Sequence, residues 1–248
     1  LKFIFLRQII MLNKVIVLIP VYKTISSEEE KRSMLQTLKV LGNHPIRIIG
    51  PENIDYREYK EMGFTDDQIM RMHADHFKGI AAYNKMLCAK WFYRTFEDFE
   101  YIFIMQNDAW VFRDELDIWC SKGYDYIGSP WIWKPEQTKA KVLIELFPIM
   151  KGEIGNGGVS LRRTMTFIKL SNVASSIYAL IKKNEDFIWL LVAKLPFIKI
   201  KKPAIEEALR FCIEMEPDQA MEMIGGQIPF TVHAYERYGK EFWRKYMV

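Results

Sequence analysis

Short apolar runs separated by helix-like segments are the feature that most constrains the fold of this chain. The runs lie at residues 14–20, 45–51, 101–105 and 125–131. Apolar runs of this length, bounded by proline, glycine or polar residues, are typical of strands in a parallel sheet that is buried on both faces. Their alternation with helices implies right-handed crossovers and a sheet covered by helices. We therefore predict an α/β fold with a mostly parallel sheet.

Helix signals fill the intervals between these runs. Ser26 and Ser27, followed by three glutamates, predict the start of a helix, and Gly42 predicts its end. Further helices are expected over 79–96, where aromatic residues are frequent, over 164–195 and over 204–215.

Composition indicates one globular domain. The 248 residues are 50% hydrophobic and 27% charged, which excludes a disordered chain. A net charge of +4 suits an anionic small molecule or a lipid head group, and the chain has no dense basic stripe of the kind that binds nucleic acid. The three cysteines form no Cys-x-x-Cys pair, so we expect reduced core residues in a cytosolic compartment.

The first residues of the chain form an apolar stretch that resembles a membrane segment at first sight. Lys2, Arg7 and Lys14 interrupt it before about 18 apolar residues accumulate, and no small-residue cleavage site follows. We expect Met11 to be a natural start preceded by an extension, and the protein to be soluble without a transmembrane helix.

Polar residues follow the third apolar run directly. Gln106, Asn107 and Asp108 come where the predicted strand ends. Ligands collect at the carboxyl ends of parallel strands, and a carboxylate there can hold a divalent cation against a diphosphate. The alternative is that Asp108 only caps the next turn.

A second pair of carboxylates, Glu185 and Asp186, follows Asn184. One of them could accept a proton from an incoming hydroxyl. Alternatively, Asn184 is the N-cap of a helix and the acids only stabilise its first turn.

Glycines at 155–158 let the backbone approach a ligand closely, because no side chain intervenes. The stretch matches neither the dinucleotide-binding fingerprint nor a phosphate-binding Walker loop, and it could be a plain tight turn. His233 alone is better explained as a packed core residue, and Trp131 as a core aromatic or a wall that stacks on a sugar or base.

An apolar segment with four lysines covers 187–203. Two interpretations remain open. It is a buried helix followed by a lysine-rich end, or it docks at an anionic membrane surface.

Several stretches, taken in order, carry a resemblance to a known class of enzymes. They lie at 19–23 (Ile-Pro-Val-Tyr-Lys), 83–84 (Tyr-Asn), 106–116 (Gln-Asn-Asp-Ala-Trp-Val-Phe-Arg-Asp-Glu-Leu), 119–120 (Trp-Cys), 124–131 (Tyr-Asp-Tyr-Ile-Gly-Ser-Pro-Trp), 155–162 (Gly-Asn-Gly-Gly-Val-Ser-Leu-Arg), 184–186 (Asn-Glu-Asp) and 229–235 (Pro-Phe-Thr-Val-His-Ala-Tyr). The chain resembles the GT-A class of nucleotide-sugar-dependent glycosyltransferases, and most of all a poorly characterised bacterial family found among polysaccharide-synthesis genes. The resemblance spans residues 14 to about 246, and the block 101–131 is its most specific part.

The resemblance implies a GT-A-like, Rossmann-related domain at 14–248 after an N-terminal extension at 1–13. Residues 14–133 would form the nucleotide-binding half, and 155–248 the acceptor-side half with its helical C-terminal part. The implied activity is transfer of a sugar from a nucleotide diphosphate sugar, usually a UDP-sugar, to a hydroxyl of a glycan or lipid-linked acceptor. It would be metal-assisted and inverting, in the cytoplasm or peripherally at the inner face of the membrane.

The resemblance also implies roles for particular residues. Asp108 would bind Mn²⁺ or Mg²⁺, with His233 as a second metal ligand. Asp186 matches the catalytic base of inverting members, with Glu185 beside it. The donor would contact Pro20, Val21, Tyr22, Asn84, Gln106, Asn107, Asp108, Trp131, Asn156, Gly157 and Gly158.

One departure from the class pattern favours other functions. Gln106 stands where such enzymes keep the first carboxylate of an Asp-x-Asp metal motif, and the amide lowers the charge of the site. A non-catalytic module that binds a sugar or nucleotide is therefore an alternative, and a structural or interaction protein is another.

The lysine-bearing segment 134–154 is expected to fold over the donor and exclude water.

Overall fold

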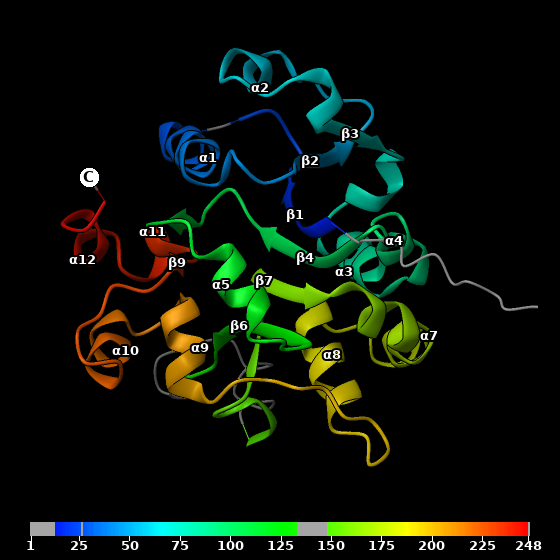
Figure 1. The fold of residues 1–248 in the computed structure, drawn as a ribbon. Coiled ribbons are helices and arrows are strands. Elements are labelled where there is room, and N and C mark those ends of the chain that lie inside the picture. Colours follow the sequence, from blue (N-terminus) through cyan, green and yellow to red (C-terminus); the bar gives the residue numbers. More distant parts are fainter. Residues whose placement is uncertain (1–12, 26, 133–147, 248) are drawn as a thin grey trace, which may run out of the picture.

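The computed structural model describes residues 13–25, 27–132 and 148–247 (Figure 1). The strands are β1 (Asn13–Pro20), β2 (Ile46–Pro51), β3 (Ile69–Met72), β4 (Phe99–Met105), β5 (Trp110–Val111), β6 (Tyr126–Pro130), β7 (Ile154–Arg163), β8 (Cys212–Ile213) and β9 (Thr231–Val232). The α-helices are α1 (Glu28–Leu41), α2 (Arg57–Glu61), α3 (Ile80–Cys88), α4 (Lys90–Arg94), α5 (Leu116–Ser121), α7 (Thr164–Ile181), α8 (Glu185–Ala193), α9 (Ile205–Phe211), α10 (Pro217–Met223), α11 (Tyr235–Tyr238) and α12 (Lys240–Arg244). The described residues also include the 3-10 helices η1 (Asp66–Gln68) and η2 (Ala74–Phe77).

The central sheet has six strands in the order β3-β2-β1-β4-β7-β6. The first four are parallel to one another, and β7 runs antiparallel to both β4 and β6. A smaller sheet, β5-β9-β8, lies beside it. This mostly parallel α/β arrangement confirms the predicted fold class.

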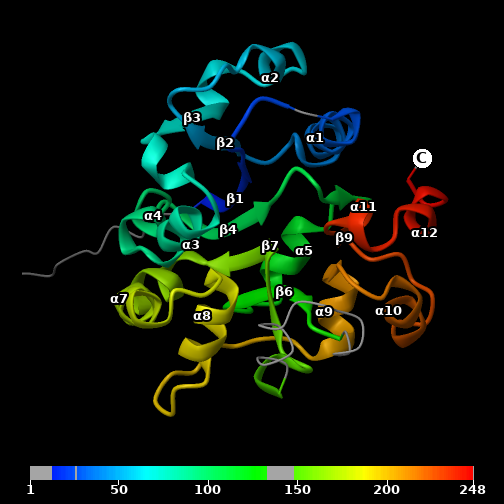
Figure 2. The ribbon, with the colours of Figure 1, turned by 180° about the vertical axis from the view of Figure 1, so that it is seen from behind.

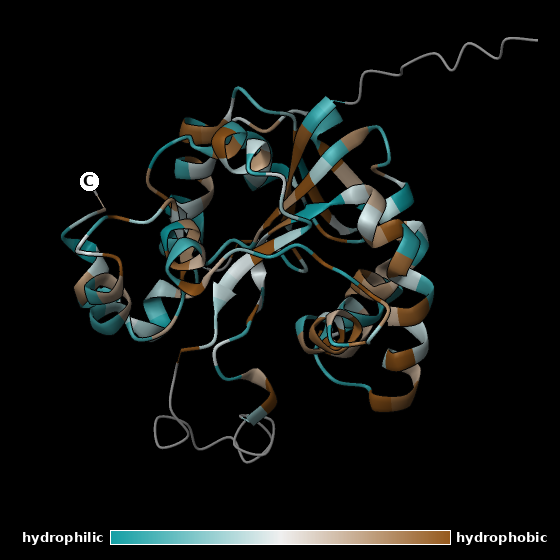
Figure 3. Ribbon diagram, turned by 60° about the horizontal axis from the view of Figure 1, so that its bottom comes forward, coloured by the Kyte–Doolittle hydropathy of each residue, from teal (hydrophilic) through white to brown (hydrophobic). Residues whose placement is uncertain are grey.

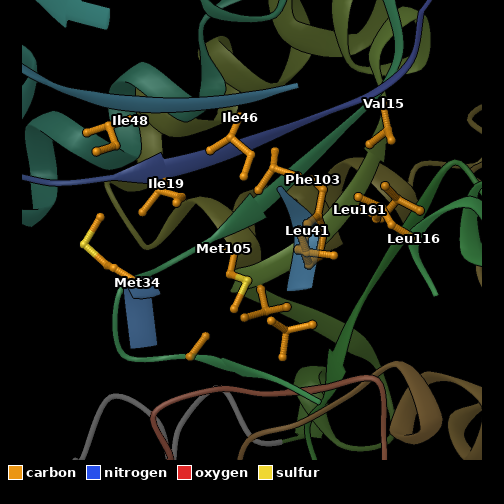
Figure 4. Packing of buried hydrophobic residues seen from close by; sticks show 14 of the residues in the cluster. Val15, Ile19, Met34, Leu41, Ile46, Ile48, Phe103, Met105, Leu116 and Leu161 are labelled. Carbon is orange, nitrogen blue, oxygen red and sulfur yellow. The ribbon is translucent and has the colours of Figure 1, made fainter. Parts of the chain in front are cut away.

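Side chains of the central strands alternate between two hydrophobic layers. On β1, Val15 and Ile19 belong to the layer that also contains Met34 of α1, whereas Ile16 and Leu18 belong to the opposite layer. Figure 4 shows the first layer, where side chains of β1, β2, β4 and α1 meet. Because successive residues of a strand point to opposite faces, a continuous apolar run can fill both layers.

Helices cover both faces of the central sheet. The layer that contains Met34 is packed against α1 and α5, and the opposite layer against α3, α4, α7 and α8. Figures 1 and 2 show these two groups of helices on either side of the strands. In Figure 3, hydrophobic residues gather along the strands and on the helix surfaces turned toward them.

Several predicted elements occur where the sequence placed them. The helix α1 starts after Ser27, whose side-chain oxygen accepts a hydrogen bond from the backbone N–H of Glu30 at 3.1 Å. The three cysteines are buried with free thiols. In segment 187–203, Ile188, Trp189 and Leu190 are buried in α8, as the buried-helix interpretation expects, whereas Phe197 beyond the helix is 97% exposed. Docking of this segment at a membrane surface stays a prediction. No helix in the described part of the chain is long and apolar enough to span a bilayer.

Two local predictions were wrong. The long helix expected over 79–96 is divided into α3 and α4 at Ala89, whose ψ of 137° is extended. The Tyr93 hydroxyl donates to the Leu87 carbonyl at 2.7 Å across this break, which satisfies a group that helix termination leaves free. The glycines at 155–158 lie inside β7 and do not form a turn.

Two predicted segments fall mainly outside the described residues. The N-terminal extension at 1–13 has only Asn13 within them, at the start of β1. Of the segment 134–154, residues 134–147 lie outside the described part of the chain.

Candidate active site

A cleft of about 860 Å³ opens where β1 and β4 end and β7 passes beside them. All the residues that the sequence analysis assigned to the site line this cleft: Pro20, Val21, Tyr22, Asn84, Gln106, Asn107, Asp108, Trp131, Asn156, Gly157, Gly158, Glu185, Asp186 and His233. If the protein only had a structural or interaction role, these residues would not be expected to lie around one cleft. The structure thus brings the predicted residues together, while their chemical roles stay predictions.

The buried ring of His233 lies between two carboxylates. Its Nε2 atom is 3.3 Å from Oδ1 of Asp108, and its Nδ1 atom is 3.3 Å from Oε1 of Glu214. The side-chain oxygen of Gln106 lies 3.1 Å from Nε2. The small sheet makes this cluster possible, because His233 directly follows β9, which pairs with both β5 and β8.

The two carboxylates control the charge of His233. Burial alone would lower the pKa of the ring, but Glu214 and Asp108 outweigh it and raise the pKa to about 10. Burial likewise opposes ionisation of Asp108, yet the contact with His233 holds the pKa of this carboxyl below its usual value. Without a bound cation, His233 is therefore an imidazolium that balances two anions.

Asp108 and His233 fit a divalent cation whose other ligands are phosphate oxygens of a bound molecule and water. Oδ1 of Asp108 is buried and makes no hydrogen bond, which leaves a carboxylate oxygen available as a ligand. Within the described residues, no group of three or more His, Cys, Asp or Glu side chains is arranged to enclose a metal ion. This agrees with the usual binding of Mg²⁺ by one or two protein ligands together with phosphate oxygens and water.

The two glycines of β7 make room for functional side chains. A Cβ atom on Gly158 would lie 2.2 Å from Cε1 of His233, and one on Gly157 would lie 2.0 Å from Oε1 of Glu185. The glycines therefore make room for the chain's own side chains, and close approach of this backbone to a ligand stays a prediction.

Glu185 is engaged in a buried ion pair. Its two carboxylate oxygens lie 2.9 and 3.2 Å from Nη2 and Nη1 of Arg162, which is fully buried. Arg162 also donates to the hydroxyls of Tyr93 and Ser160. Both carboxylate oxygens of Glu185 are thus engaged by Arg162, and this ion pair links the start of α8 to β7.

Asp186 faces the cleft from the first turn of α8 and is half-buried. Its Oδ1 accepts a hydrogen bond from the backbone N–H of Phe187 at 2.7 Å. Burial, and next the negative charge of Glu185, raise the pKa of Asp186 to about 7. A carboxylate with this pKa can accept a proton near neutral pH.

The start of α8 is capped by a residue from another helix. Asn184 occupies the N-cap position, as the alternative interpretation held, but its side chain makes no capping hydrogen bond. Instead, Oδ1 of the buried Asn84 on α3 accepts from the backbone N–H of Glu185 at 3.2 Å, and the Asn84 amide donates to Asn184. Asn84, predicted to contact the donor, thus lines the cleft and also positions α8.

Sequence reasoning missed other residues of the cleft. Glu214 follows β8, a strand of only two residues that has no recognisable pattern. Lys183 and Arg237 add positive charge to the lining. Arg162 lies in the resemblance-bearing stretch, but nothing in the sequence pairs it with Glu185.

Comparisons with solved structures identify the fold. The glycosyltransferase GlyE of Streptococcus pneumoniae TIGR4 matches with a TM-score of 0.57 and 10% identity, over 95% of this chain and 60% of that one. A galactosyltransferase, LgtC, in complex with donor and acceptor sugar analogs matches with a TM-score of 0.57 and 10% identity, over 94% of this chain and 95% of that one. A glycosyltransferase involved in glycosylation of the major capsid of PBCV-1 matches with a TM-score of 0.50 and 9% identity, over 95% and 100%.

These likenesses show that the chain has the fold of GT-A glycosyltransferases, and that it spans 60% of the length of GlyE. No curated protein matches the sequence. The profile of a family described as "Protein of unknown function (DUF5672)" matches residues 66–233, which is more than half of the 248. The chain therefore belongs to the DUF5672 family.

Proposed function

We propose that this protein is a metal-assisted glycosyltransferase that moves a sugar from a nucleotide diphosphate sugar to a hydroxyl of a glycan or lipid-linked acceptor, with inversion at the anomeric carbon. The observation that carries the proposal is the pairing of two chemical groups in one cleft. Asp108 and His233 can hold a cation, and Asp186, with a pKa of about 7, can accept a proton. The GT-A fold supports the same conclusion.

The donor would lie along the ends of β1 and β4. Pro20, Val21 and the exposed Tyr22 line the cleft after β1 and offer a surface for a nucleoside. A mannosyltransferase of the same fold, Ktr4p from S. cerevisiae, is described in complex with GDP, and LgtC with donor and acceptor sugar analogs. These structures support a nucleotide in this position, and we propose a UDP-sugar as the donor.

The diphosphate would be the leaving group. When bound, Mn²⁺ or Mg²⁺ would supply positive charge for the oxygens that become more negative as the glycosidic bond breaks. Asp108 and His233 would hold that cation. Lys183 and Arg237 contribute further positive charge to the cleft lining.

Asp186 would act on the acceptor. Its carboxylate takes the proton of an acceptor hydroxyl while the hydroxyl oxygen forms a bond to the anomeric carbon. On the opposite face of the sugar, the bond from that carbon to the diphosphate oxygen breaks, and its electron pair leaves with the diphosphate. A single displacement of this kind inverts the configuration. Asn84 and the Arg162–Glu185 pair keep Asp186 in place by fixing the start of α8.

A non-catalytic module that binds a sugar or nucleotide is the second candidate, and the amide of Gln106 is the observation that favours it. Turnover separates the two functions. We expect the protein with Mn²⁺ to release free nucleoside diphosphate from at least one of a panel of UDP- and GDP-sugars. Asp186→Asn should lower this release by about 100-fold or more, since general-base catalysis contributes 10²–10⁴.

Donor binding provides the control for that variant. Asp186→Asn should bind the donor as the unaltered protein does, because Asp186 is assigned to the acceptor. Donor binding without any turnover by the unaltered protein, or equal turnover by the variant, would support the binding module instead.

A further inference from the structure

Two side-chain oxygens lie beside Nε2 of His233 in the cleft, each at a distance that suits neighbouring ligands of one metal ion. The side-chain oxygen of Gln106 and Oδ1 of Asp108 lie 3.1 and 3.3 Å from Nε2 of His233. In an octahedral site with metal–ligand bonds of about 2.1 Å, neighbouring ligand atoms are about 3.0 Å apart. The backbone N–H of Gln106 donates to the Gly158 carbonyl at 3.0 Å, which fixes the residue where this spacing is possible.

Gly158 is the residue that permits this convergence. A Cβ atom there would lie 2.3 Å from Nε2 of His233 and 2.8 Å from the side-chain oxygen of Gln106. Both functional atoms therefore occupy space that any larger residue would fill. The absence of a Cβ atom at Gly158 thus leaves room for the side chains of both His233 and Gln106.

These three ligands carry little negative charge for a divalent cation. Asp108 contributes one negative charge and the Gln106 amide contributes none. His233 contributes none either, because it ligates as the neutral imidazole after the cation displaces its proton to solvent. A second carboxylate nevertheless lies close, because Oε1 of Glu214 is 3.3 Å from Nδ1 of His233, on the far side of the ring. At this distance Glu214 acts on the ring first through its negative charge.

We infer that Gln106 is a third protein ligand of the metal, and that Glu214, acting through the His233 ring, supplies the negative charge that Gln106 lacks. The inference rests on the proposed function for the metal itself. It assigns Gln106 as a ligand atom and Glu214 as a positioning residue that does not touch the metal.

The experiment measures Mn²⁺ alone, from the loss of the free-ion electron paramagnetic resonance signal on titration into the whole protein. We expect Glu214→Gln to weaken Mn²⁺ affinity by about 10- to 100-fold, the usual effect of losing a partner of a ligating histidine. Gln106→Leu should weaken it by about tenfold or more, because a ligand is lost. The exposed Glu222→Gln on α10, which removes the same charge elsewhere, should leave the affinity unchanged.

The double variant Gln106→Asp with Glu214→Gln separates a charge effect from a structural one. If Glu214 supplies charge, a new carboxylate at position 106 should restore Mn²⁺ affinity to within about threefold of the unaltered protein. The single variant Gln106→Asp completes the cycle, because a carboxylate at position 106 can raise the affinity by itself. If Glu214 supplies charge, Gln106→Asp should raise the affinity more in the Glu214→Gln background than in the unaltered protein, whereas a role in packing predicts equal increases. Near-ultraviolet circular dichroism without metal confirms that each variant is folded.

Three results would overturn the inference: unchanged affinity in Glu214→Gln, unchanged affinity in Gln106→Leu, or failure of Gln106→Asp to restore affinity. Each of these leaves nucleotide release by the unaltered protein intact, so they do not refute the proposed function. Conversely, the absence of release from every donor, together with the predicted Mn²⁺ affinities, would refute the transferase and keep the metal site.

Discussion

Asp186 owes its proposed chemistry to the side chains around it. An aspartate in water ionises near pH 4 and is a weak base at neutral pH. Burial and the neighbouring Glu185 raise the pKa of Asp186 to about 7, while Arg162 neutralises Glu185 directly. Because Arg162 compensates the charge of Glu185, the carboxyl group of Asp186 can lie next to Glu185.

The pH dependence of turnover tests this assignment. Asp186 must be ionised to accept a proton, so kcat should rise with pH through a midpoint of about 7 and level off above it. Glu185→Gln removes a negative charge next to Asp186, which lowers the pKa and should move this midpoint to lower pH. The profile is measured at saturating donor and Mn²⁺, with the exposed Glu206→Gln on α9 as the matched control, whose midpoint should not move. A midpoint near pH 4 in the unaltered protein would contradict the role of Asp186.

At the scale of elements, α8 is held by contacts that its own sequence does not contain. Its capping oxygen comes from Asn84 on α3, and its buried charge is paired with Arg162 on β7. Local pattern correctly predicted a helix start near Asn184, because acids and a polar residue precede an apolar run. It could not predict which asparagine accepts the hydrogen bond, since that depends on the packing of α3 against α8.

The buried ion pair should dominate the stability of this region. Arg162→Met leaves the Glu185 carboxylate buried without a partner, and removal of one member of a buried pair costs about 3–5 kcal/mol. The double variant Arg162→Met with Glu185→Met should recover much of that loss, because no uncompensated charge remains. Urea unfolding measures both.

The exposed Arg244 of α12, which pairs with Glu241 at 2.8 Å, supplies the comparison. Arg244→Met should hardly change the urea midpoint, because exposed pairs contribute little. Equal midpoints for Arg162→Met and Arg244→Met would show that the buried pair is not an anchor.

At the scale of the whole molecule, the ends of β1 and β4 in the central sheet and the end of β9 in the small sheet bring residues from Pro20 to His233 into one cleft. The apolar runs predicted these strands and their mostly parallel order, and the polar residues that follow them predicted one edge of the cleft. Glu214 and its pairing with His233 could not be predicted, because β8 and β9 are two residues each and show no periodicity. Their register arises from long-range pairing, because β9 pairs with β5 and β8 pairs with β9. The division of the helix expected over 79–96 was not predicted either. Tyr93, just after the break, accepts a hydrogen bond from Arg162, and a contact between residues so far apart in the sequence leaves no local pattern.

Thermal unfolding with a panel of nucleoside diphosphates, with and without Mn²⁺, tests the central claim most directly. A ligand that binds only the folded state at a hundredfold excess over its Kd contributes about 2.7 kcal/mol, which for a chain of this size raises the Tm by roughly 5–10 °C. We expect such a rise for one nucleoside diphosphate only when Mn²⁺ is present. Asp108→Asn should abolish it, and the exposed Asp218→Asn on α10 should retain it. No rise with any nucleoside diphosphate, or an equal rise in Asp108→Asn, would contradict a metal-assisted donor site in this cleft.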